Sequence, residues 1–276
     1  MKLVMKDVIR KALLLLCLLL PCHAMAAEKT IRILALAPHI CEMFYAIHAE
    51  RMLVGAVDYC DYPEAAKALP RVGNYAGINV EAALRLKPDL AVVMSRHVKG
   101  VAMLEKMGVQ IVESNPLDFE TMFDDIKRLG EISQHTQEAN DLVQKLQLRL
   151  QHVRASPHPD VAVFYELWAD PLMTVGGKSF IHDVIQAAGG RNIFAGIALA
   201  APRVNVEAVI RAKPSVIVVP LEKRAIKARK KFWQSWLGDE VRVVSVNPDL
   251  LHRPGPRLLD GLEQLHAALS GERLSP

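Results

Sequence analysis

The chain lacks the short motifs that mark many enzyme active sites. It has no nucleophile elbow, no complete phosphate-binding loop and no helical His pair of the metalloprotease type. Gly176-Gly177-Lys178-Ser179 has the ending of a phosphate loop, but the glycine required five residues before Gly177 is Leu172. We interpret this segment as a turn between a strand and a helix. We therefore expect no catalytic residue, no cofactor and no resident metal.

Long apolar runs are also scarce. After residue 26 no stretch reaches the roughly 18 continuous apolar residues that suggest a membrane-spanning helix. Residues 1–26 instead have the pattern of a signal peptide, because four basic residues precede the uncharged run Ala12 to Leu20 and Ala24-Met25-Ala26 offers small residues for cleavage. We expect cleavage near Ala26 and a soluble periplasmic product. A retained anchor and lipidation at Cys22 are the alternatives, although proline before that cysteine fits a lipoprotein signal poorly.

The chain also lacks a large excess of charged residues of one sign. The chain has 34 Lys and Arg against 30 Asp and Glu, and residues 1–26 hold four of the bases and one of the acids, so the remainder has 30 against 29. A nearly neutral exported protein is not expected to bind nucleic acid. The basic run from Lys223 to Lys231 is interpreted as the solvated face of a helix that buries Ile226, Phe232 and Trp236.

Cysteine is rare, and two of the four lie in the signal segment. Cys41 is expected at the start of the helix after a strand over residues 31–36, and Cys60 just after a strand over 53–57. Neighbouring strand ends bring the two together, so they form either a disulfide in an oxidising compartment or two buried thiols. Neither belongs to a Cys-x-x-Cys or Cys/His cluster, so no zinc or redox role is expected.

What the chain does contain is an internal repeat. Residues 79–93 read NVEAALRLKPDLAVV and residues 205–219 read NVEAVIRAKPSVIVV, with nine of fifteen positions identical at a separation of 126. Asn79 and Asn205 are good helix N-caps, and the proline of each copy ends the helix before a short Val-rich strand. The repeat predicts two copies of one α/β lobe with mainly parallel sheets.

A long helix is expected between the two lobes. Thr136, with Glu138 behind it, is predicted to cap this helix, in which Leu142, Leu146 and Leu150 recur at four-residue steps. Such a helix is a rod of about 30 Å that holds the lobes apart with a ligand cleft between them. The predicted organisation is a signal peptide over residues 1–26, an N-terminal lobe over 27–135, a connecting helix over 136–156 and a C-terminal lobe over 157–276.

The mature chain resembles the helical-backbone class of periplasmic substrate-binding proteins, and most of all its vitamin B12-binding branch. The resemblance covers essentially the whole mature chain. It rests on the repeat, the joining helix and the segments VDYCDYP at 57–63, PRVG at 70–73, GINVE at 77–81, PLMTVG at 171–176 and AAGGRNIF at 187–194. Members of this class serve ABC importers of vitamin B12, ferric siderophores and haem.

The resemblance implies a non-enzymatic receptor, monomeric when free, that captures a corrinoid and delivers it to the transmembrane subunits of an ABC importer. In that family an acidic residue on the rim of each lobe meets arginines of the importer. The matching residues here are Glu81 and Glu207. Each glutamate also stabilises the start of its own helix, and the two roles are compatible.

The cleft residues implied by the resemblance are Tyr59, Tyr75, Trp168, Asp249 and Arg253. Each has a simpler alternative: ring packing for the tyrosines, a core position for the tryptophan, and a surface ion pair for the last two. Where the relatives carry a cleft tryptophan shortly before the second-lobe glutamate, this chain has Ala201. Either another side chain covers that part of the ligand, or the ligand differs.

Other functions stay open at this point. Haem or a ferric siderophore is the alternative ligand, and Tyr59, Tyr75 or His97 would be available as an axial ligand to haem iron. The sequence assigns no side chain to a ligand's metal. Outside the class, the same two-lobed body would suit a periplasmic enzyme or a structural partner protein.

Overall fold

The structure is a computed structural model that describes residues 30–74, 76–157, 160–221 and 225–271. Every described helix and strand lies between residues 31 and 271. The predicted signal peptide, Cys22 and Tyr75 lie outside the described residues. No helix in the described ranges has the length and apolar character needed to cross a bilayer.

The first lobe is built around a parallel sheet with the strand order β2-β1-β5-β6. Its strands are β1 (Ile33–Ala35), β2 (Leu53–Ala56), β5 (Leu90–Val93) and β6 (Gln110–Glu113). Its helices are α2 (Pro38–Ala46), α3 (Val80–Arg85), α4 (Val101–Lys106) and α5 (Phe119–Ile132), with short 3-10 turns at Glu50–Met52 and Glu64–Ala68. A small hairpin joins β3 (Gly73–Asn74) to β4 (Gly77–Ile78).

The second lobe repeats this plan with the strand order β10-β7-β11-β12, again parallel. Its main strands are β7 (Val161–Tyr165), β10 (Gly190–Asn192), β11 (Val216–Val219) and β12 (Arg242–Ser245). Its helices are α7 (Phe180–Ala187), α8 (Val206–Ala212), α9 (Ile226–Leu237), α10 (Pro248–Leu251) and α11 (Leu258–Ser270). A hairpin of β8 (Trp168–Ala169) and β9 (Leu172–Met173) follows β7. The predicted α/β fold of two similar lobes with parallel sheets is confirmed.

The repeat occupies equivalent places in the two lobes. In each copy the asparagine side chain caps its helix, since Asn79 Oδ1 accepts from the Ala82 amide at 3.0 Å and Asn205 Oδ1 accepts from the Ala208 amide at 2.9 Å. The strand that follows, β5 or β11, then lies between two parallel neighbours. All four residues of each strand are buried, because both faces of a parallel sheet are covered, and this explains the Val-rich runs.

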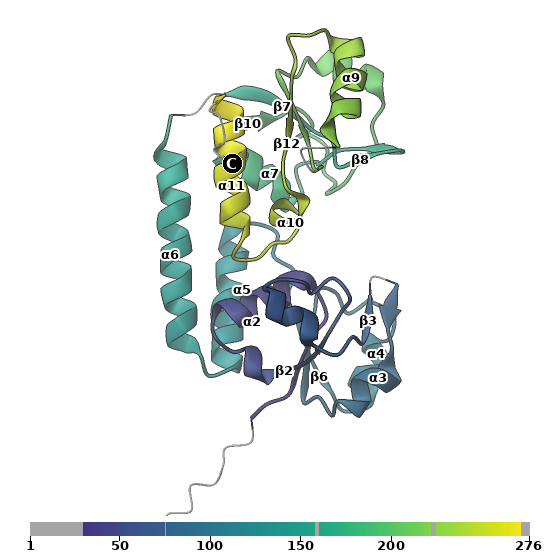
Figure 1. The fold of residues 1–276 in the computed structure, drawn as a ribbon, viewed down its shortest axis with the longest axis vertical. Helices are drawn as coiled ribbons and strands as arrows, with labels where there is room; N and C mark the ends of the chain where they lie inside the picture. The colour runs from purple at the N-terminus through teal and green to yellow at the C-terminus, as the bar shows by residue number, and fades with distance from the viewer. Residues whose placement is uncertain (1–29, 75, 158–159, 222–224, 272–276) are drawn as a thin grey trace, which may run out of the picture. The chain divides into compact units, whose positions relative to one another are not determined.

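One long helix, α6 (Thr136–Ala155), joins the lobes and packs beside α5 and α11 (Figure 1). Leu146 and Leu150 are buried as the four-residue spacing predicted, together with Val143 and Val153. The predicted cap is wrong, because the N-cap is His135 and makes no side-chain capping hydrogen bond. Thr136 is already helical, so its hydroxyl is one residue too late to cap the first turn.

The glycine pair at residues 176–177 lies in the turn between β9 and α7, as the sequence predicted. Both amides donate to the loop opposite, Gly176 to the Ala200 carbonyl at 3.1 Å and Gly177 to the Ile197 carbonyl at 2.9 Å. A Cβ on either glycine would collide with a carbonyl oxygen of that loop. The glycines therefore permit close backbone packing, and Ser179 caps α7.

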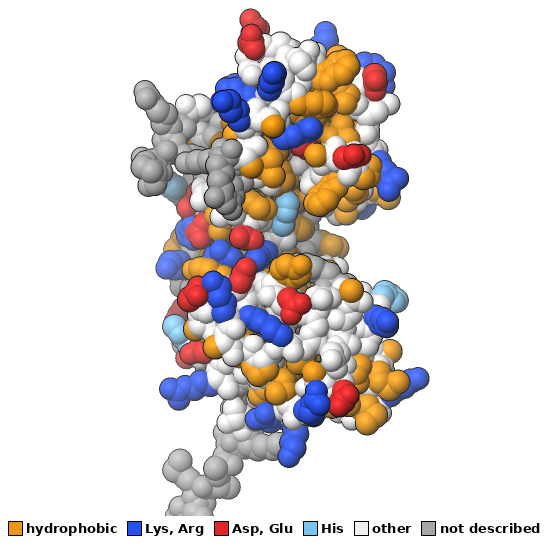
Figure 2. Space-filling model, turned by 45° about the vertical axis from the view of Figure 1, so that its right-hand side comes forward, with side chains coloured by type: hydrophobic (Ala, Val, Ile, Leu, Met, Phe, Trp, Pro, Cys, Tyr) orange, Lys and Arg blue, Asp and Glu red, His pale blue; other side chains and the backbone are white. Residues whose placement is uncertain are grey.

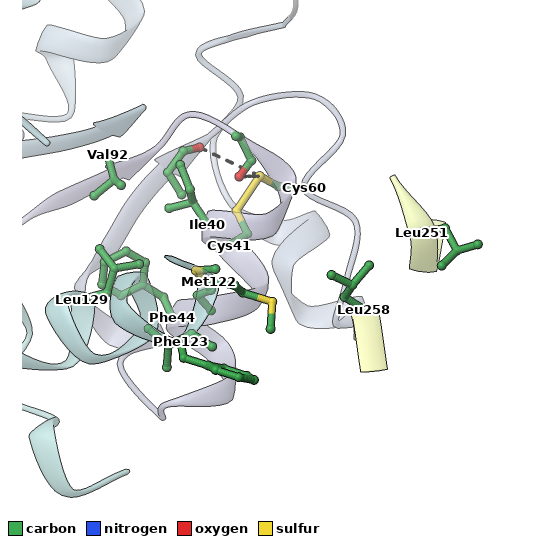
Figure 3. Close-up of a cluster of buried hydrophobic side chains, with 14 of the residues drawn as sticks. Ile40, Cys41, Phe44, Cys60, Val92, Met122, Phe123, Leu129, Leu251 and Leu258 are labelled. Atoms are coloured by element: carbon green, nitrogen blue, oxygen red, sulfur yellow. Dashed lines mark hydrogen bonds between the residues drawn. A yellow bond between two sulfur atoms is a disulfide. The ribbon is translucent and has the colours of Figure 1, made fainter. Parts of the chain in front are cut away.

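The largest core cluster includes residues of both lobes and the helices that join them. Around α2 it contains Phe44, Met122 and Phe123, and Cys41 forms a disulfide with Cys60 (Figure 3). Of the two alternatives for these cysteines, the structure has the disulfide.

A smaller cluster packs α9 onto the second sheet, and it corrects one prediction. The buried tryptophan is Trp233, whereas Trp236 is 53% exposed and Ile226 and Phe232 are half-buried. At about 100° per residue, position 233 returns to the direction of position 226, but position 236 is rotated away by about 80°. The helix therefore presents a different face to the sheet than the sequence suggested.

Candidate binding site

A cavity of about 640 Å³ opens at the carboxyl ends of the second-lobe strands. Segments that follow three strands form its wall: residues 166–169 after β7, residues 220–221 after β11, and Pro248 and His252 around α10. Strand ends of parallel α/β sheets are where ligands commonly bind, because the loops there converge without side chains of the sheet core between them. Most of the wall is apolar, and hydrophobic side chains gather on this lobe in Figure 2.

Trp168 lies in this wall, at the start of the β8–β9 hairpin. Its side chain is 62% exposed, and its indole N–H donates to the Asp170 carbonyl at 2.8 Å. The alternative of a core position is therefore wrong. The hydrogen bond fixes the indole, and most of its surface is open to solvent. The ring can therefore offer an aromatic face to a flat ligand.

A buried ion pair that the sequence did not predict forms another part of the wall. Glu166 is only 3% exposed, and its oxygens accept from Arg229 Nε at 2.7 Å and from Arg229 Nη2 at 2.6 Å. Trp233 Nε1 donates to the same carboxylate. The guanidinium also lies over the Phe232 ring, 4.2 Å from its centroid. The basic run around Arg229 predicted a solvated helix face, and no local signal reveals a partner 63 residues away.

The remaining ionisable group among the described residues of the wall is His252. Its Nε2 lies 3.0 Å from the Tyr165 hydroxyl, and burial lowers the pKa of His252 below its ordinary value. Burial also raises the pKa of the Tyr165 phenol. Both side chains are therefore uncharged at neutral pH.

Asp249 and Arg253 form the ion pair that their spacing suggested, at 2.9 Å, but Arg253 also binds the first lobe. Its Nη1 donates to Asp61 at 2.6 Å and to Glu42 at 3.2 Å. Arg257 donates to the same Glu42 at 2.6 and 2.9 Å. We call Glu42, Asp61, Asp249, Arg253 and Arg257 the inter-lobe ion network.

Three members of the inter-lobe ion network have little contact with water. Arg253 and Arg257 are mostly buried, and Glu42 is 2% exposed. The hydrogen bond from Arg253 is the main cause that holds the pKa of Asp61 below its usual value. Figure 2 shows acidic and basic side chains intermixed at the level where the two lobes meet. In this structure Arg253 serves mainly to join the lobes.

A second cavity of about 310 Å³ lies between α2, α6 and α11. Arg149 of α6, which lines this cavity, donates to Asp260 at 2.6 Å and to Glu263 at 2.8 Å, both on α11. These bonds fix the connecting helix to the second lobe.

The other residues predicted for the cleft do not line the larger cavity. Tyr59 is about half exposed in the turn after β2, His97 is exposed after β5, and Ala201 is exposed before α8. Among the described residues no group of three or more His, Cys, Asp or Glu side chains is arranged to hold a metal ion. The structure thus brings Trp168 to the cavity and joins Asp249 to Arg253, but leaves Tyr59 on the first lobe.

Glu81 and Glu207 occupy matching places, each at the second position of its helix in the repeat. Both are exposed. Glu81 forms an ion pair with Arg85 at 3.0 Å, one turn further along α3.

The protein has two α/β lobes with parallel sheets, one connecting helix, and a cavity at the strand ends of the second lobe. This is the architecture of a solute-binding protein. A family model described as periplasmic binding protein matches residues 33–235. The chain therefore belongs to the periplasmic binding protein family, which implies a periplasmic location.

Within this family, the chain is similar to vitamin B12-binding proteins. The chain is 33% identical over 263 residues to a vitamin B12-binding protein of Yersinia pseudotuberculosis, covering 93% of this chain and 91% of that one. It matches the crystal structure of the periplasmic vitamin B12-binding protein of Vibrio cholerae with a TM-score of 0.78 and 33% identity, over 87% of this chain and 96% of that one.

The fold is shared with haem-binding proteins too. The periplasmic haem-binding protein of Vibrio cholerae matches with a TM-score of 0.76, over 87% of this chain and 99% of that one, but at 18% identity. At that identity the match supports the fold alone.

Proposed function

We propose that this protein is a periplasmic receptor that captures a corrinoid of the vitamin B12 type and delivers it to an inner-membrane ABC importer. The observation that carries the proposal is the 33% identity to vitamin B12-binding proteins over nearly the whole chain. Its role is binding and not turnover, so the corrinoid is cargo and not a cofactor. The signal segment is removed near Ala26, and the free receptor is a monomer.

The cavity of the second lobe supports this choice of ligand. A corrinoid is a large, flat ring fringed with amides, and it suits a site with a mostly apolar wall, an open aromatic face and few polar groups. Trp168 supplies the aromatic face at the rim. Tyr59 and Tyr75 cover the ligand from the first lobe, while Asp249 and Arg253 lie beside it where the two lobes meet.

We further propose that Glu81 and Glu207 dock the loaded receptor on the importer. Two exposed carboxylates at equivalent helix starts of two similar lobes suit a pair of basic pockets related by a two-fold axis.

The docking proposal is tested with Glu81→Gln and Glu207→Gln, singly and together. Each single change is expected to weaken binding to the purified importer by about fivefold, because a rim ion pair contributes about 1 kcal/mol. Glu64→Gln, another exposed glutamate of the first lobe, is the control and should leave binding unchanged. Affinity for cyanocobalamin should be the same in all variants. Unchanged importer binding in the double variant would contradict the proposal.

Haem or a ferric siderophore is the second candidate ligand, since the importer class that the sequence resembles also serves these two. In that case Tyr59, Tyr75 or His97 would supply the axial ligand to haem iron.

Titration calorimetry of the mature protein against cyanocobalamin and then haemin, with visible spectra alongside, separates the candidates. We expect tight one-to-one binding of cyanocobalamin and no shift of the haemin Soret band. No heat with cyanocobalamin, together with a Soret shift, would replace the corrinoid by haem.

A further inference from the structure

We infer that Arg229 and Glu166 form a charge-neutral hydrogen-bond donor in the cavity wall, which selects a ligand with amide carbonyls over one with carboxylates. The inference rests on the proposed function, because it requires the ligand to enter this cavity. It adds a chemical basis by which the receptor distinguishes neutral from acidic tetrapyrrole-like rings.

The geometry of the pair fixes the guanidinium in one orientation. Two parallel hydrogen bonds join Arg229 to Glu166, and Trp233 Nε1 donates to the same carboxylate. The guanidinium plane is further held by the Phe232 and Trp233 rings, whose centroids lie 4.2 and 5.6 Å from Arg229 Cζ. A guanidinium held in this way loses little freedom when it binds a ligand.

One end of the guanidinium stays available. Nε and Nη2 bind Glu166, whereas Nη1 makes no hydrogen bond to another described residue and is not among the buried atoms without a partner. The Arg229 side chain is 20% exposed and lines the cavity. Nη1 therefore offers its N–H groups to a hydrogen-bond acceptor in the cavity.

The charge of the wall decides which acceptor is preferred. The described ionisable side chains that line the cavity are Glu166, Arg229 and His252. Glu166 neutralises Arg229, and His252 is uncharged at neutral pH because burial lowers its pKa. A carboxylate would bring an uncompensated negative charge against apolar walls, which is strongly unfavourable. An amide carbonyl accepts the same N–H groups without adding charge.

The test compares cyanocobalamin with its monocarboxylates, each made by hydrolysing one peripheral amide to a carboxylate. The wild-type protein should bind cyanocobalamin at least about tenfold more tightly than the monocarboxylate whose altered group meets Arg229. Glu166→Gln leaves the guanidinium charge uncompensated and should reduce this ratio about tenfold or reverse it. Lys230→Gln, on an exposed position of α9, is the control and should leave the ratio unchanged.

A double variant separates the loss of the guanidinium from a general loss of structure. Arg229→Gln alone leaves Glu166 buried and unpaired, so the double variant Glu166→Gln/Arg229→Gln keeps the wall neutral while removing the guanidinium. It should bind cyanocobalamin about tenfold more weakly, with a far-ultraviolet circular dichroism spectrum like that of the wild type. An unchanged cyanocobalamin affinity would contradict the role of Arg229.

The failures of the two proposals are distinguishable. If the wild-type protein binds cyanocobalamin but binds every monocarboxylate equally well, or if Glu166→Gln leaves the ratio unchanged, this inference is wrong and the proposed function stands. If the wild-type protein does not bind cyanocobalamin at all, the proposed function is wrong and this inference fails with it.

Discussion

At the scale of single residues, Glu42 is the clearest case of a charge that the fold must satisfy. It is almost wholly buried in α2 of the first lobe, and its two oxygens accept hydrogen bonds from Arg253 and Arg257 of the second. A buried charge is tolerated only when it is paired. Removing Glu42 would take from Arg257 the carboxylate that it binds and would leave Arg253 with Asp61 and Asp249 alone. The stability of the joint between the lobes therefore depends on this carboxylate.

We predict that Glu42→Gln lowers the free energy of unfolding by about 3 kcal/mol, since it leaves two largely buried arginines without their shared partner. Urea denaturation measures the effect. Glu64→Gln, which breaks the exposed Glu64–Lys67 pair, should cost less than about 1 kcal/mol. Equal stabilities of the two variants would show that the inter-lobe ion network does not hold the lobes together.

His39 provides a prediction about pH. It is fully buried in α2, its Nε2 donates to the Ser114 carbonyl at 3.1 Å, and burial lowers the pKa of His39 from 6.5 to about 4. Between these values the unfolded chain binds a proton that the folded chain does not, so stability falls as the pH drops from 6.5 towards 4. The loss is about 3 kcal/mol once the pH is below 4.

The measurement is urea denaturation of the wild type and of His39→Gln between pH 7.5 and 4.5. The variant keeps an N–H donor for Ser114 but cannot titrate, so its stability should fall less steeply with acid. Parallel curves would mean that His39 does not contribute to the pH dependence.

At the scale of secondary-structure elements, the disulfide ties α2 to the turn after β2. Both cysteines are buried, and 19 positions separate them in the sequence. A closed loop of this size restricts the unfolded chain by about 3 kcal/mol in the chain-entropy model.

Cys41→Ala/Cys60→Ala should therefore lose about 3 kcal/mol of stability, whereas dithiothreitol should reduce the native protein slowly because neither sulfur is accessible. Thermal denaturation of the double variant, and the rate at which dithiothreitol releases thiols from the native wild type, check the two statements. A double variant as stable as the wild type would contradict the first, and rapid release of thiols from the native protein would contradict the second.

The elements themselves were largely predictable from the sequence. The repeat predicted α3 with β5 and α8 with β11, because capping and proline act on neighbours in the sequence. The buried face of α9 was predicted wrongly, since several apolar residues lie on different faces of that helix and only the sheet beneath it decides which is buried. Local patterns thus identify elements better than their orientation.

The site was less predictable than the fold. Trp168 lines the larger cavity, but its role towards a ligand stays a prediction. The binding partners of Arg253 lie 192 and 211 residues away, and Arg229 looked like one of several surface bases. No spacing rule links residues so distant, because their contact depends on how the two lobes and their loops are arranged. Ion pairs between lobes therefore appear only in the folded structure.

At the scale of the whole described body, the lobes are joined in more than one way. The helix α6 is bound to α11 by the Arg149 ion pairs, and the inter-lobe ion network forms a second connection. A wide hinge motion would have to break buried ion pairs, so we predict only modest closure when ligand binds.

Small-angle scattering with and without cyanocobalamin tests this prediction. The radius of gyration should change by no more than about 1 Å, because preorganised partners move their interface backbone by about that much or less on binding. A decrease of several ångströms would indicate a large hinge closure and contradict the picture of a rigid joint.

The most direct test of the central claim is a crystal structure of the mature protein with cyanocobalamin. We predict a corrin ring in the cavity at the strand ends of the second lobe, against Trp168, with a peripheral amide carbonyl within hydrogen-bond distance of Arg229 Nη1. A ligand bound elsewhere, or crystals that stay free of corrinoid at saturating concentration, would contradict the account.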